Sequence, residues 1–207
     1  EVMAGMGYME HGGDEDMFSL DKDGLVLVGT AEHSLVPMHK DSTFRKEDLP
    51  RRYVGFSPAF RREAGSYGKD TKGILRVHEF DKVEMVSFVA ENDDDKEQEF
   101  LLSLEEKLFQ KLEIPYQVVK MCTGDLGFPT ARKYDIEAWI PSQDKYREMT
   151  SASTITDFQS RRLNIKYTDG QDKKYVQILN GTAFAIGRTL IAILENYQQE
   201  DGSVVIP

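Results

Sequence analysis

Apolar residues recur at helical spacing in two stretches of the chain and predict two amphipathic helices. Residues 92–95 offer an N-cap and a negatively charged first turn for the first helix, which ends at Glu113. Its apolar residues lie three or four apart and comprise Leu101, Leu104, Leu108 and Leu112. The second helix ends before Asp201, and its apolar face comprises Ile186, Leu190, Ile193, Leu194 and Tyr197. A shorter helix is predicted near residues 155–163.

Segments rich in β-branched and aromatic residues predict strands along much of the remaining chain. Residues 50–63 and 74–90 are expected to form two antiparallel strands joined by the polar, glycine-bearing loop 65–73. The apolar run 25–32 predicts a buried strand, whereas residues 1–24 carry turn signals and predict a loop. Further strands are predicted at 116–121, 135–140, 146–150 and 175–179.

This succession of many strands, few helices and long connections is typical of an α+β fold. We expect a mostly antiparallel β-sheet flanked by helices, with residues 1–207 forming one domain. The chain begins at Glu1 without an initiating methionine and stops directly after the strand-like segment 203–206. We therefore expect it to be a fragment of a longer protein.

Composition narrows the class of protein to which the chain can belong. Hydrophobic residues make up 40% of it and charged residues 30%, which is typical of globular proteins rather than disordered or fibrous ones. No apolar run approaches membrane-spanning length, and the first residues do not resemble a secretory signal. The single cysteine, Cys122, cannot form an internal disulfide and is assigned to the core. We expect a reducing, cytoplasmic location and no membrane partner.

Charge is distributed unevenly and points to a localised anionic ligand. The formal net charge of −10 argues against a protein that wraps DNA or another long nucleic acid, because phosphate binding depends on clustered Lys and Arg. Residues 45–82 nevertheless carry ten basic side chains against six acidic ones. A local basic zone on an acidic protein favours a compact polyanion such as a triphosphate. Charge scattered over the surface stays an alternative.

The densest cluster of charged and aromatic residues runs from Phe60 to Glu84. Arginine suits forked contact with phosphate oxygens and can stabilise charge that develops at a reacting phosphorus. Residues two apart on a strand share a face, so Arg61 and Glu63 are predicted to point the same way. The acidic run 91–99 is interpreted as the solvated start of a helix and not as a metal site.

Four segments of the chain resemble sequence motifs of class II aminoacyl-tRNA synthetases, in particular those of the seryl branch, and they follow one another along the chain as the family's motifs do. FRREAGSYGKDTKGILRVHEFDKVE (60–84) is similar to the second signature motif, and its AGS-x-G-x-DT-x-G loop looks like the seryl branch. GTAEHSL (29–35) is similar to the family's serine-site segment. YREMTSAS-x-x-x-DFQSRR (146–162) resembles the E-x-x-S and FQ-x-RR elements, and LNGTAFAIGRTLIAILENYQ (179–198) resembles the third signature motif.

The resemblance implies a class II catalytic core that activates serine with ATP and passes it to a tRNA specific for serine. It assigns Arg61 to the ATP α-phosphate and the serine carboxylate, and Arg188 to the γ-phosphate and the adenine. Phe80 would stack on the other side of the adenine, and Glu63 would recognise its amino group. The residues implied in ATP binding are Arg61, Arg62, Glu63, Val77, Phe80, Glu148, Met149, Thr150, Ser151 and Arg188.

The same resemblance implies a magnesium ion and a serine pocket. Glu148 and Ser151 would bind Mg²⁺ that bridges the phosphates. Glu84 and Thr182 would lie closest to the serine hydroxyl, so that the pocket rejects alanine for want of that hydroxyl and threonine for its size. Thr30 and Glu32 would lie nearer the amino group, and the full set implied in serine binding is Thr30, Ala31, Glu32, Arg61, Glu84, Asn180 and Thr182.

Neither step that the resemblance implies needs a protein nucleophile. The serine carboxylate attacks ATP, and the tRNA hydroxyl then attacks the seryl-adenylate. His78 is accordingly interpreted as a structural member of its motif. Two residues depart from the family's usual pattern, Glu79 in place of Gln and Ser160 in place of Ala, and neither is among the ligand-binding side chains implied above.

The family's N-terminal coiled-coil arm, which grips the long variable arm of the tRNA, and its first signature motif are not recognised in this sequence. The resemblance implies that the longer protein is a homodimer. It also implies that this chain alone, in which those two segments are not recognised, aminoacylates tRNA weakly or not at all. Two alternatives stay open. One is a non-catalytic, synthetase-like binding or regulatory module, and the other is a ligase that loads an amino acid onto a carrier protein.

Overall fold

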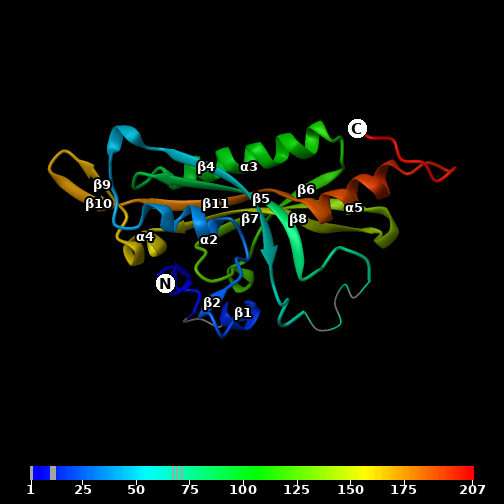
Figure 1. Ribbon diagram of the computed structural model, residues 1–207. Helices are drawn as coiled ribbons and strands as arrows, with labels where there is room; N and C mark the ends of the chain where they lie inside the picture. Colours follow the sequence, from blue (N-terminus) through cyan, green and yellow to red (C-terminus); the bar gives the residue numbers. More distant parts are fainter. Residues whose placement is uncertain (1, 10–12, 67, 69, 71) are drawn as a thin grey trace.

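The centre of the computed structural model, which describes all residues except 1, 10–12, 67, 69 and 71, is a six-stranded sheet. Its strand order is β4-β5-β11-β8-β7-β6, and every neighbouring pair is antiparallel. The strands are β4 (Arg51–Phe60), β5 (Glu79–Val89), β6 (Tyr116–Lys120), β7 (Arg132–Ile140), β8 (Lys145–Thr156) and β11 (Gln177–Ala185). This sheet and its flanking helices confirm the predicted α+β class (Figure 1).

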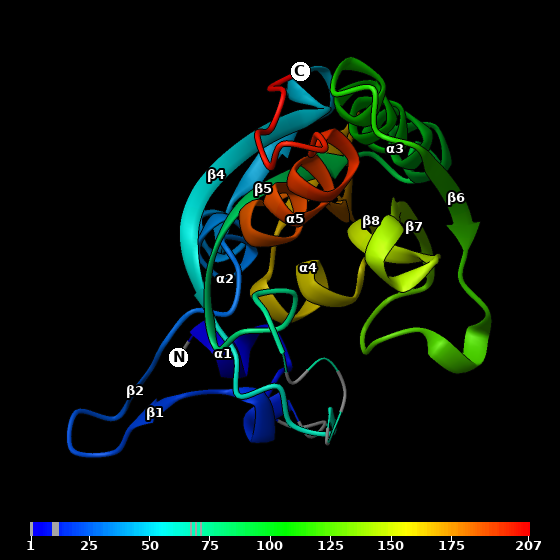
Figure 2. The same ribbon diagram turned by 90° about the vertical axis from the view of Figure 1, so that its right-hand side faces the viewer.

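Helices pack on both faces of the sheet. On one face lie α3 (Asp94–Lys111) and α5 (Ile186–Tyr197), whereas the short helices α2 (Glu32–Leu35) and α4 (Phe158–Leu163) lie on the other (Figures 1 and 2). The chain enters through α1 (Val2–Gly5), beside α2 and α4. The sheet therefore has two separately covered faces, which require two hydrophobic cores.

Strand β5 contributes to both cores because neighbouring residues of a strand point to opposite faces. Met85 and Val89 pack in the core under α3 and α5. Val86 and Phe88 pack in the core on the α2 and α4 side. Apart from the buried Ser87, this half of β5 thus contributes apolar side chains to both cores, and the charged residues of β5 lie in its other half, from Glu79 to Glu84.

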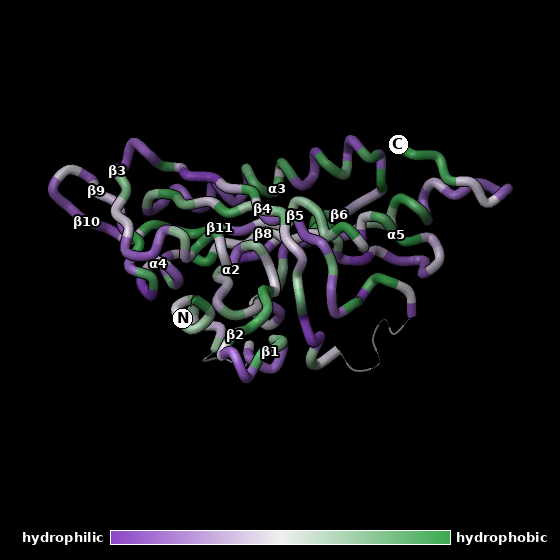
Figure 3. The backbone as a smooth tube through the Cα atoms, in the orientation of Figure 1, coloured by the Kyte–Doolittle hydropathy of each residue, from purple (hydrophilic) through white to green (hydrophobic). Residues whose placement is uncertain are grey.

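Helix α3 has the amphipathic character predicted for it. Leu101 is buried, and Leu104, Leu108 and Leu112 pack against the same core. Apolar and polar stretches alternate along the coil of α3 (Figure 3). Its first turn is acidic as predicted, but the N-cap residue Asp93 makes no side-chain capping hydrogen bond. Within the described residues, no group of three or more His, Cys, Asp or Glu side chains could hold a metal ion.

The predicted buried strand at 25–32 is wrong. Only Leu25–Val26 is a strand, β2, which pairs with β1 (Ser19–Leu20), and Leu25 is 59% exposed. The next residues run as irregular chain across the end of β4, where the Phe60 amide donates to the Val28 carbonyl at 2.8 Å. The segment preceding it, predicted as loop, also contains α1 and a 3-10 turn at Gly13–Asp16. An apolar run that covers the end of a sheet cannot be told from a strand by its hydrophobicity.

The remaining differences concern strand length and short polar strands. β8 continues to Thr156, so the predicted helix near 155–163 starts as α4 at Phe158. The predicted strand 175–179 divides between β10 (Asp172–Tyr175) and β11. A small sheet of order β10-β9-β3 was not predicted, because β3 (Thr43–Arg45), β9 (Lys166–Asp169) and β10 are rich in charged residues and lack clear alternation.

Cys122 is exposed, so its assignment to the core is wrong. It precedes a 3-10 turn at Thr123–Asp125, in the connection between β6 and β7. A small apolar side chain predicts burial only as a tendency, and here the loop context prevails. Of the helices that the structure describes, none has the length and apolar character needed to cross a membrane.

Candidate active site

Two adjoining cavities open on the sheet face opposite α3. The first, with a volume of about 210 Å³, lies between the connection from β4 to β5, strands β5 and β8, and the start of α5. The second, of about 500 Å³, lies between the N-terminal segment, α2 and the middle of the sheet. Arg61, Lys82 and Ser151 line both cavities, which therefore meet at these three side chains.

Two arginines from distant parts of the chain share the first cavity. Arg61 follows β4, and its guanidinium donates from Nε to the Gly29 carbonyl at 3.2 Å and lies 5.4 Å from the centre of the Phe80 ring. Arg188 lies in the first turn of α5, and its Nη1 donates to the Glu148 carbonyl at 2.9 Å. Protein contacts thus orient both guanidinium groups before any ligand binds, which lowers the cost of binding an anion between them.

The first cavity gathers nearly all of the residues that the resemblance implies in ATP binding. Those that line it are Arg61, Glu63, Val77, Phe80, Glu148, Met149, Thr150, Ser151 and Arg188. Arg62 is the exception. Its Nε donates to the Met17 carbonyl at 2.7 Å, and its guanidinium lies 4.6 Å from the Phe18 ring centre. Arg62 therefore holds the N-terminal segment against the connection after β4.

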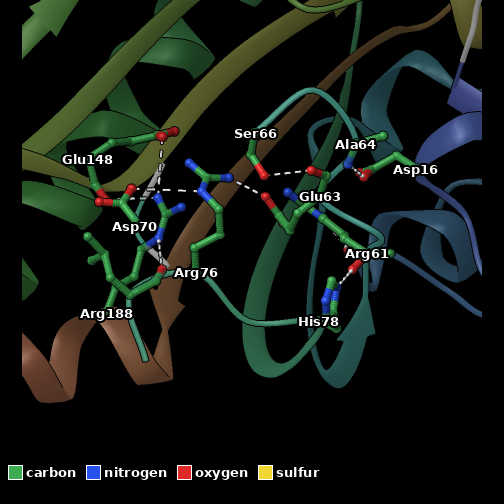
Figure 4. A network of polar contacts seen from close by, with 12 residues as sticks. Asp16, Arg61, Glu63, Ala64, Ser66, Asp70, Arg76, His78, Glu148 and Arg188 are labelled. Carbon is green, nitrogen blue, oxygen red and sulfur yellow. Dashed lines mark hydrogen bonds and ion pairs between the residues drawn. The ribbon is translucent and has the colours of Figure 1, made fainter. Parts of the chain in front are cut away.

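The prediction that Arg61 and Glu63 share a strand face is wrong, because β4 ends at Phe60 and Glu63 has a left-handed backbone with φ 54°. A turn brings both side chains to the first cavity instead. There the Glu63 carboxylate forms an ion pair with Arg76 (Figure 4). The backbone of Arg61 is fixed by His78, whose carbonyl accepts from the Arg61 amide at 2.9 Å and whose Nδ1 lies 3.1 Å from the Arg61 carbonyl. These contacts support the structural role predicted for His78.

The connection between β4 and β5 is tied to the rest of the cavity by charge. Asp70 forms an ion pair with Arg147 of β8, and its Oδ2 lies 3.8 Å from Arg76 Nε. Arg188 donates from Nε to the Leu75 carbonyl at 3.3 Å. These contacts link the described part of this connection to β8 and α5, and they form a continuous polar network beside the cavity (Figure 4).

The second cavity is lined by five of the residues that the resemblance implies in serine binding: Thr30, Glu32, Arg61, Glu84 and Asn180. Thr182 lines the first cavity, but its Oγ1 donates to Glu84 Oε2 at 3.2 Å. Ala31 is buried and lines neither cavity. A Cβ atom added at Gly55 of β4 would lie only 2.9 Å from the Cβ atom of Ala31. Ala31 therefore packs closely against β4.

Glu32 is a buried carboxylate with three hydrogen-bond donors around it. Oε1 accepts from Gln159 Nε2 at 2.7 Å and from the Tyr8 hydroxyl at 3.2 Å, while Oε2 accepts from Asn180 Nδ2 at 3.0 Å. Burial raises the pKa of Glu32 above its usual range, although the bond from Gln159 opposes that shift. A cation that entered the cavity would find a rigid acceptor at this position.

Lys82 is a residue of this site that sequence reasoning missed. It is 8% exposed, and its Nζ lies 2.6 Å from Glu84 Oε2 and 3.3 Å from Thr30 Oγ1. Phe80, Lys82 and Glu84 occupy alternate positions of β5 and all line the cavities. Since Phe80 and Glu84 were both assigned to the site, the period of two along this strand was a signal that could have identified Lys82.

His33 was also missed. Burial, with Arg61 and Lys82 nearby, lowers the pKa of His33 to about 3, so its ring is neutral at physiological pH. Its Nδ1 accepts from the Gly29 amide at 3.2 Å, which assigns the ring proton to Nε2. Because the Gly29 carbonyl in turn accepts from Arg61, His33 helps to fix the position of that guanidinium.

Glu148 and Ser151 offer oxygen atoms for a divalent cation. Glu148 Oε2 lies 3.3 Å from Arg188 Nη1, and Oε1 lies 3.6 Å from Lys133 Nζ. Burial raises the pKa of Glu148, but Lys133 and Arg188 outweigh that effect and lower it, so the carboxylate is ionised. Two protein oxygens fit Mg²⁺, which keeps several waters and also binds phosphate oxygens.

The tRNA synthetase class II core domain (G, H, P, S and T) matches this chain over residues 17–197. The chain is 53% identical over 207 residues to the serine–tRNA ligase of Streptomyces coelicolor, and 50% identical over 208 residues to that of Dictyoglomus thermophilum. These alignments cover 100% of this chain but 48% and 49% of the two relatives. The chain therefore spans about half the length of these curated relatives.

Solved structures agree with the sequence comparisons. A crystal structure of seryl-tRNA synthetase from Pyrococcus horikoshii complexed with ATP matches with a TM-score of 0.94 and 48% identity, and covers 100% of this chain and 46% of that chain. The cytoplasmic serine-tRNA ligase from Naegleria fowleri in complex with AMP matches with a TM-score of 0.89 and 36% identity, over 99% of this chain and 49% of that chain. Because the class II core domain matches residues 17–197, which make up most of this chain, the chain belongs to the class II tRNA synthetase core family.

Proposed function

We propose that this chain is the catalytic core of a serine–tRNA ligase, which activates L-serine with ATP and transfers it to the 3′ end of a tRNA specific for serine. One observation carries the proposal. Arg61 and Arg188 line one cavity, and Arg61 also lines a second cavity whose wall contains the buried carboxylates Glu32 and Glu84. A polyanion and a small polar amino acid can thus be held side by side.

The first cavity suits ATP. Arg61 would contact the α-phosphate together with the serine carboxylate, because it lines both cavities. Arg188, near the positive end of the α5 dipole, would contact the γ-phosphate. The adenine would stack between Arg188 and Phe80, and Glu63 would accept from its amino group. Glu63 is paired with Arg76 in this structure, so ATP would compete for that carboxylate.

The second cavity suits serine. Its ammonium group would bind Glu32, which already accepts three hydrogen bonds and is rigid. Its hydroxyl would bind the pair formed by Glu84 and Thr182. Alanine would leave both groups without a partner, which costs binding energy, whereas the extra methyl of threonine would not fit.

Activation requires no protein nucleophile in this arrangement. The serine carboxylate attacks the α-phosphorus in line, the bond to the pyrophosphate oxygen breaks, and pyrophosphate leaves with the electron pair. Arg61 and Arg188 stabilise the negative charge that develops on the phosphates. Glu148 and Ser151 would hold Mg²⁺, which neutralises phosphate charge when it is bound.

Further partners are proposed from the resemblance alone. The tRNA terminal hydroxyl would attack the carbonyl carbon of the seryl-adenylate in the same cleft, forming the ester bond as the bond to the phosphate oxygen breaks and AMP leaves. The intact protein would be a cytoplasmic homodimer. Residues 1–207 would form a single catalytic domain of that protein. The interaction with the long variable arm of the tRNA would need a segment not recognised in this sequence.

Serine-dependent exchange of pyrophosphate into ATP tests the proposal. The intact protein should support exchange with serine, and at a rate higher by a factor of about 10⁴ than with alanine. If serine supports no exchange, a non-catalytic binding module would be favoured. Faster exchange with another amino acid, or its transfer to a carrier protein in place of tRNA, would overturn the proposed specificity.

A further inference from the structure

Strand β8 contains a bulge at the edge of the first cavity. Thr150 is the partner of Ile136 on β7, but Glu148 is the partner of Glu137, which leaves Met149 as an extra residue without a partner on β7. A bulge places two successive residues of one strand opposite one residue of its neighbour and redirects the side chains around it.

The bulge changes which side chains face the cavity. Met149 packs in the core under α3 and α5, and Thr150 Oγ1 bonds to Glu105 of α3, so these two neighbours point to the same face of the sheet. In a regular strand they would point to opposite faces. Met149 and Thr150 also border the first cavity, but their side chains reach the face that α3 covers. The bulge thereby leaves Glu148 and Ser151, three positions apart, together on the opposite face, where both line the first cavity.

Glu105 of α3 is buried against strands β8 and β11. It is 0% exposed, and its Oε2 accepts from Thr150 Oγ1 at 3.0 Å. Its Oε1 has no hydrogen-bond partner among the described residues. A Cβ at Gly181 of β11 would lie 2.9 Å from this Oε1, so any larger residue there would displace the carboxyl group.

Burial raises the pKa of Glu105 well above its usual range. The hydrogen bond from Thr150 lowers this pKa. The negative charges of Glu84 and Asp135 raise it, and the positive charge of Lys82 lowers it. Burial therefore favours the protonated form of Glu105, and its Oε1 atom has no hydrogen-bond partner in the described part of the chain. An apolar side chain of the same size would avoid the cost of burying an unsatisfied oxygen, so stability of the core alone does not account for Glu105.

We infer that Glu105 is a positioning residue: its hydrogen bond to Thr150 fixes the bulge in β8 and so directs Glu148 and Ser151 together into the first cavity. The inference rests on the proposed function, because it is the binding of Mg²⁺ and ATP that would need these two oxygens on one face. Without the bond, Thr150 can turn and the extra residue can move along β8, which reverses the direction of the side chains it passes.

Equilibrium binding of ATP, measured with and without Mg²⁺ on the protein alone, tests the inference. Glu105→Leu should weaken ATP binding about tenfold in the presence of Mg²⁺, as expected for loss of one hydrogen bond that orients the ligands. Without Mg²⁺ its affinity should stay within twofold of the wild type. Glu105→Gln is the matched control. It keeps an acceptor for the Thr150 hydroxyl and should bind like the wild type under both conditions.

Thr150→Val provides a second route if Glu105→Leu does not fold. It removes the same hydrogen bond from the other side and should produce the same Mg²⁺-dependent loss, and the double variant should be no weaker than either single variant. Normal affinity in Glu105→Leu or Thr150→Val despite lower thermal stability would overturn the inference, since the bond would then be structural only. A loss in Glu105→Gln equal to that in Glu105→Leu would also overturn it.

The outcome is separable from that of the proposed function. A wild-type protein that binds ATP with Mg²⁺ but shows no serine-dependent exchange would overturn the proposed activity, and the affinities of the variants would still decide the role of Glu105. If the wild type shows serine-dependent exchange and Glu105→Leu binds ATP with unchanged affinity, only the inference about Glu105 would be overturned. A wild type that does not bind ATP would overturn both.

Discussion

The Nζ atom of Lys82 lies 2.6 Å from Oε2 of Glu84, and both residues are buried where the two cavities meet. Lys82 also donates to Thr30, and Glu84 also accepts from Thr182. One ion pair thus connects groups proposed to bind the serine amino group with groups proposed to bind its hydroxyl. Its loss should affect both stability and serine binding.

Replacing the cation of this pair tests its contribution. Lys82→Met leaves Glu84 buried without its counter-charge, which should lower the free energy of unfolding by about 3 kcal/mol in urea titrations. The serine KM in pyrophosphate exchange should rise as well. The double variant Lys82→Met/Glu84→Gln replaces the pair with neutral groups and should recover most of the stability but not serine binding. A single variant as stable as the wild type would contradict this account.

Arg188 is expected to act mainly on the charge that develops during activation. Arg188→Ala should reduce kcat/KM for pyrophosphate exchange by about 10²-fold or more, because it removes a fixed positive charge beside the phosphates. Arg188→Lys keeps the charge but loses the forked geometry that reaches both Glu148 and Leu75, so its activity should be intermediate. Arg45→Ala, at an exposed position, is the control and should stay within twofold of the wild type. Equal rates for Arg188→Ala and this control would remove Arg188 from the proposed role.

Much of the fold could be predicted because its long elements follow simple periodicity. Helix α3 presents its four leucines to the core, and β4 and β5 pair along their length as expected. The run 25–32 was misassigned because hydrophobicity does not distinguish a strand from a chain segment that covers the end of a sheet. The small sheet around β9 was missed because its residues are mostly charged.

The residues of the candidate site also divide into those that could be predicted from the sequence and those that could not. Those within recognisable motifs, such as Arg61 and Arg188, could be named from sequence, and the structure brings them to one cavity. Glu105 could not, because a glutamate within a helical pattern usually faces solvent and only the tertiary packing of α3 on Gly181 reveals its burial. The bulge at Met149 depends on pairing between strands, which a local pattern does not encode.

His33 should make the protein sensitive to acid. Its pKa is lowered from 6.5 to about 3 in the folded state, so the unfolded chain takes up a proton at this group before the folded chain does. The stability contributed by neutral His33 is present above pH 6.5 and is lost as the pH falls towards 3, by about 1.4 kcal/mol for each pH unit.

The variant His33→Asn isolates this effect, because its amide oxygen can still accept from the Gly29 amide but does not titrate. The free energy of unfolding of the wild type, relative to that of the variant, should fall between pH 6.5 and pH 4.5 by about 2–3 kcal/mol. Urea titrations at both pH values measure the difference. A constant difference between the two proteins would show that the folded state protonates His33 at pH 4.5 as readily as the unfolded chain does, so that burial does not lower its pKa.

Serine binding should release protons from Glu32. Burial raises the pKa of this carboxyl group, so the free protein keeps a proton there up to a higher pH than an exposed glutamate would. An ammonium group placed beside Glu32 favours the ionised form and lowers its pKa, and the proton must then leave on binding. Calorimetric titrations of serine at several mildly acidic pH values, each in two buffers of different ionisation enthalpy, should therefore detect net proton release. Glu32→Gln cannot titrate and should bind serine more weakly without that release. Proton uptake by the wild type, or equal release by the variant, would place the serine ammonium away from Glu32.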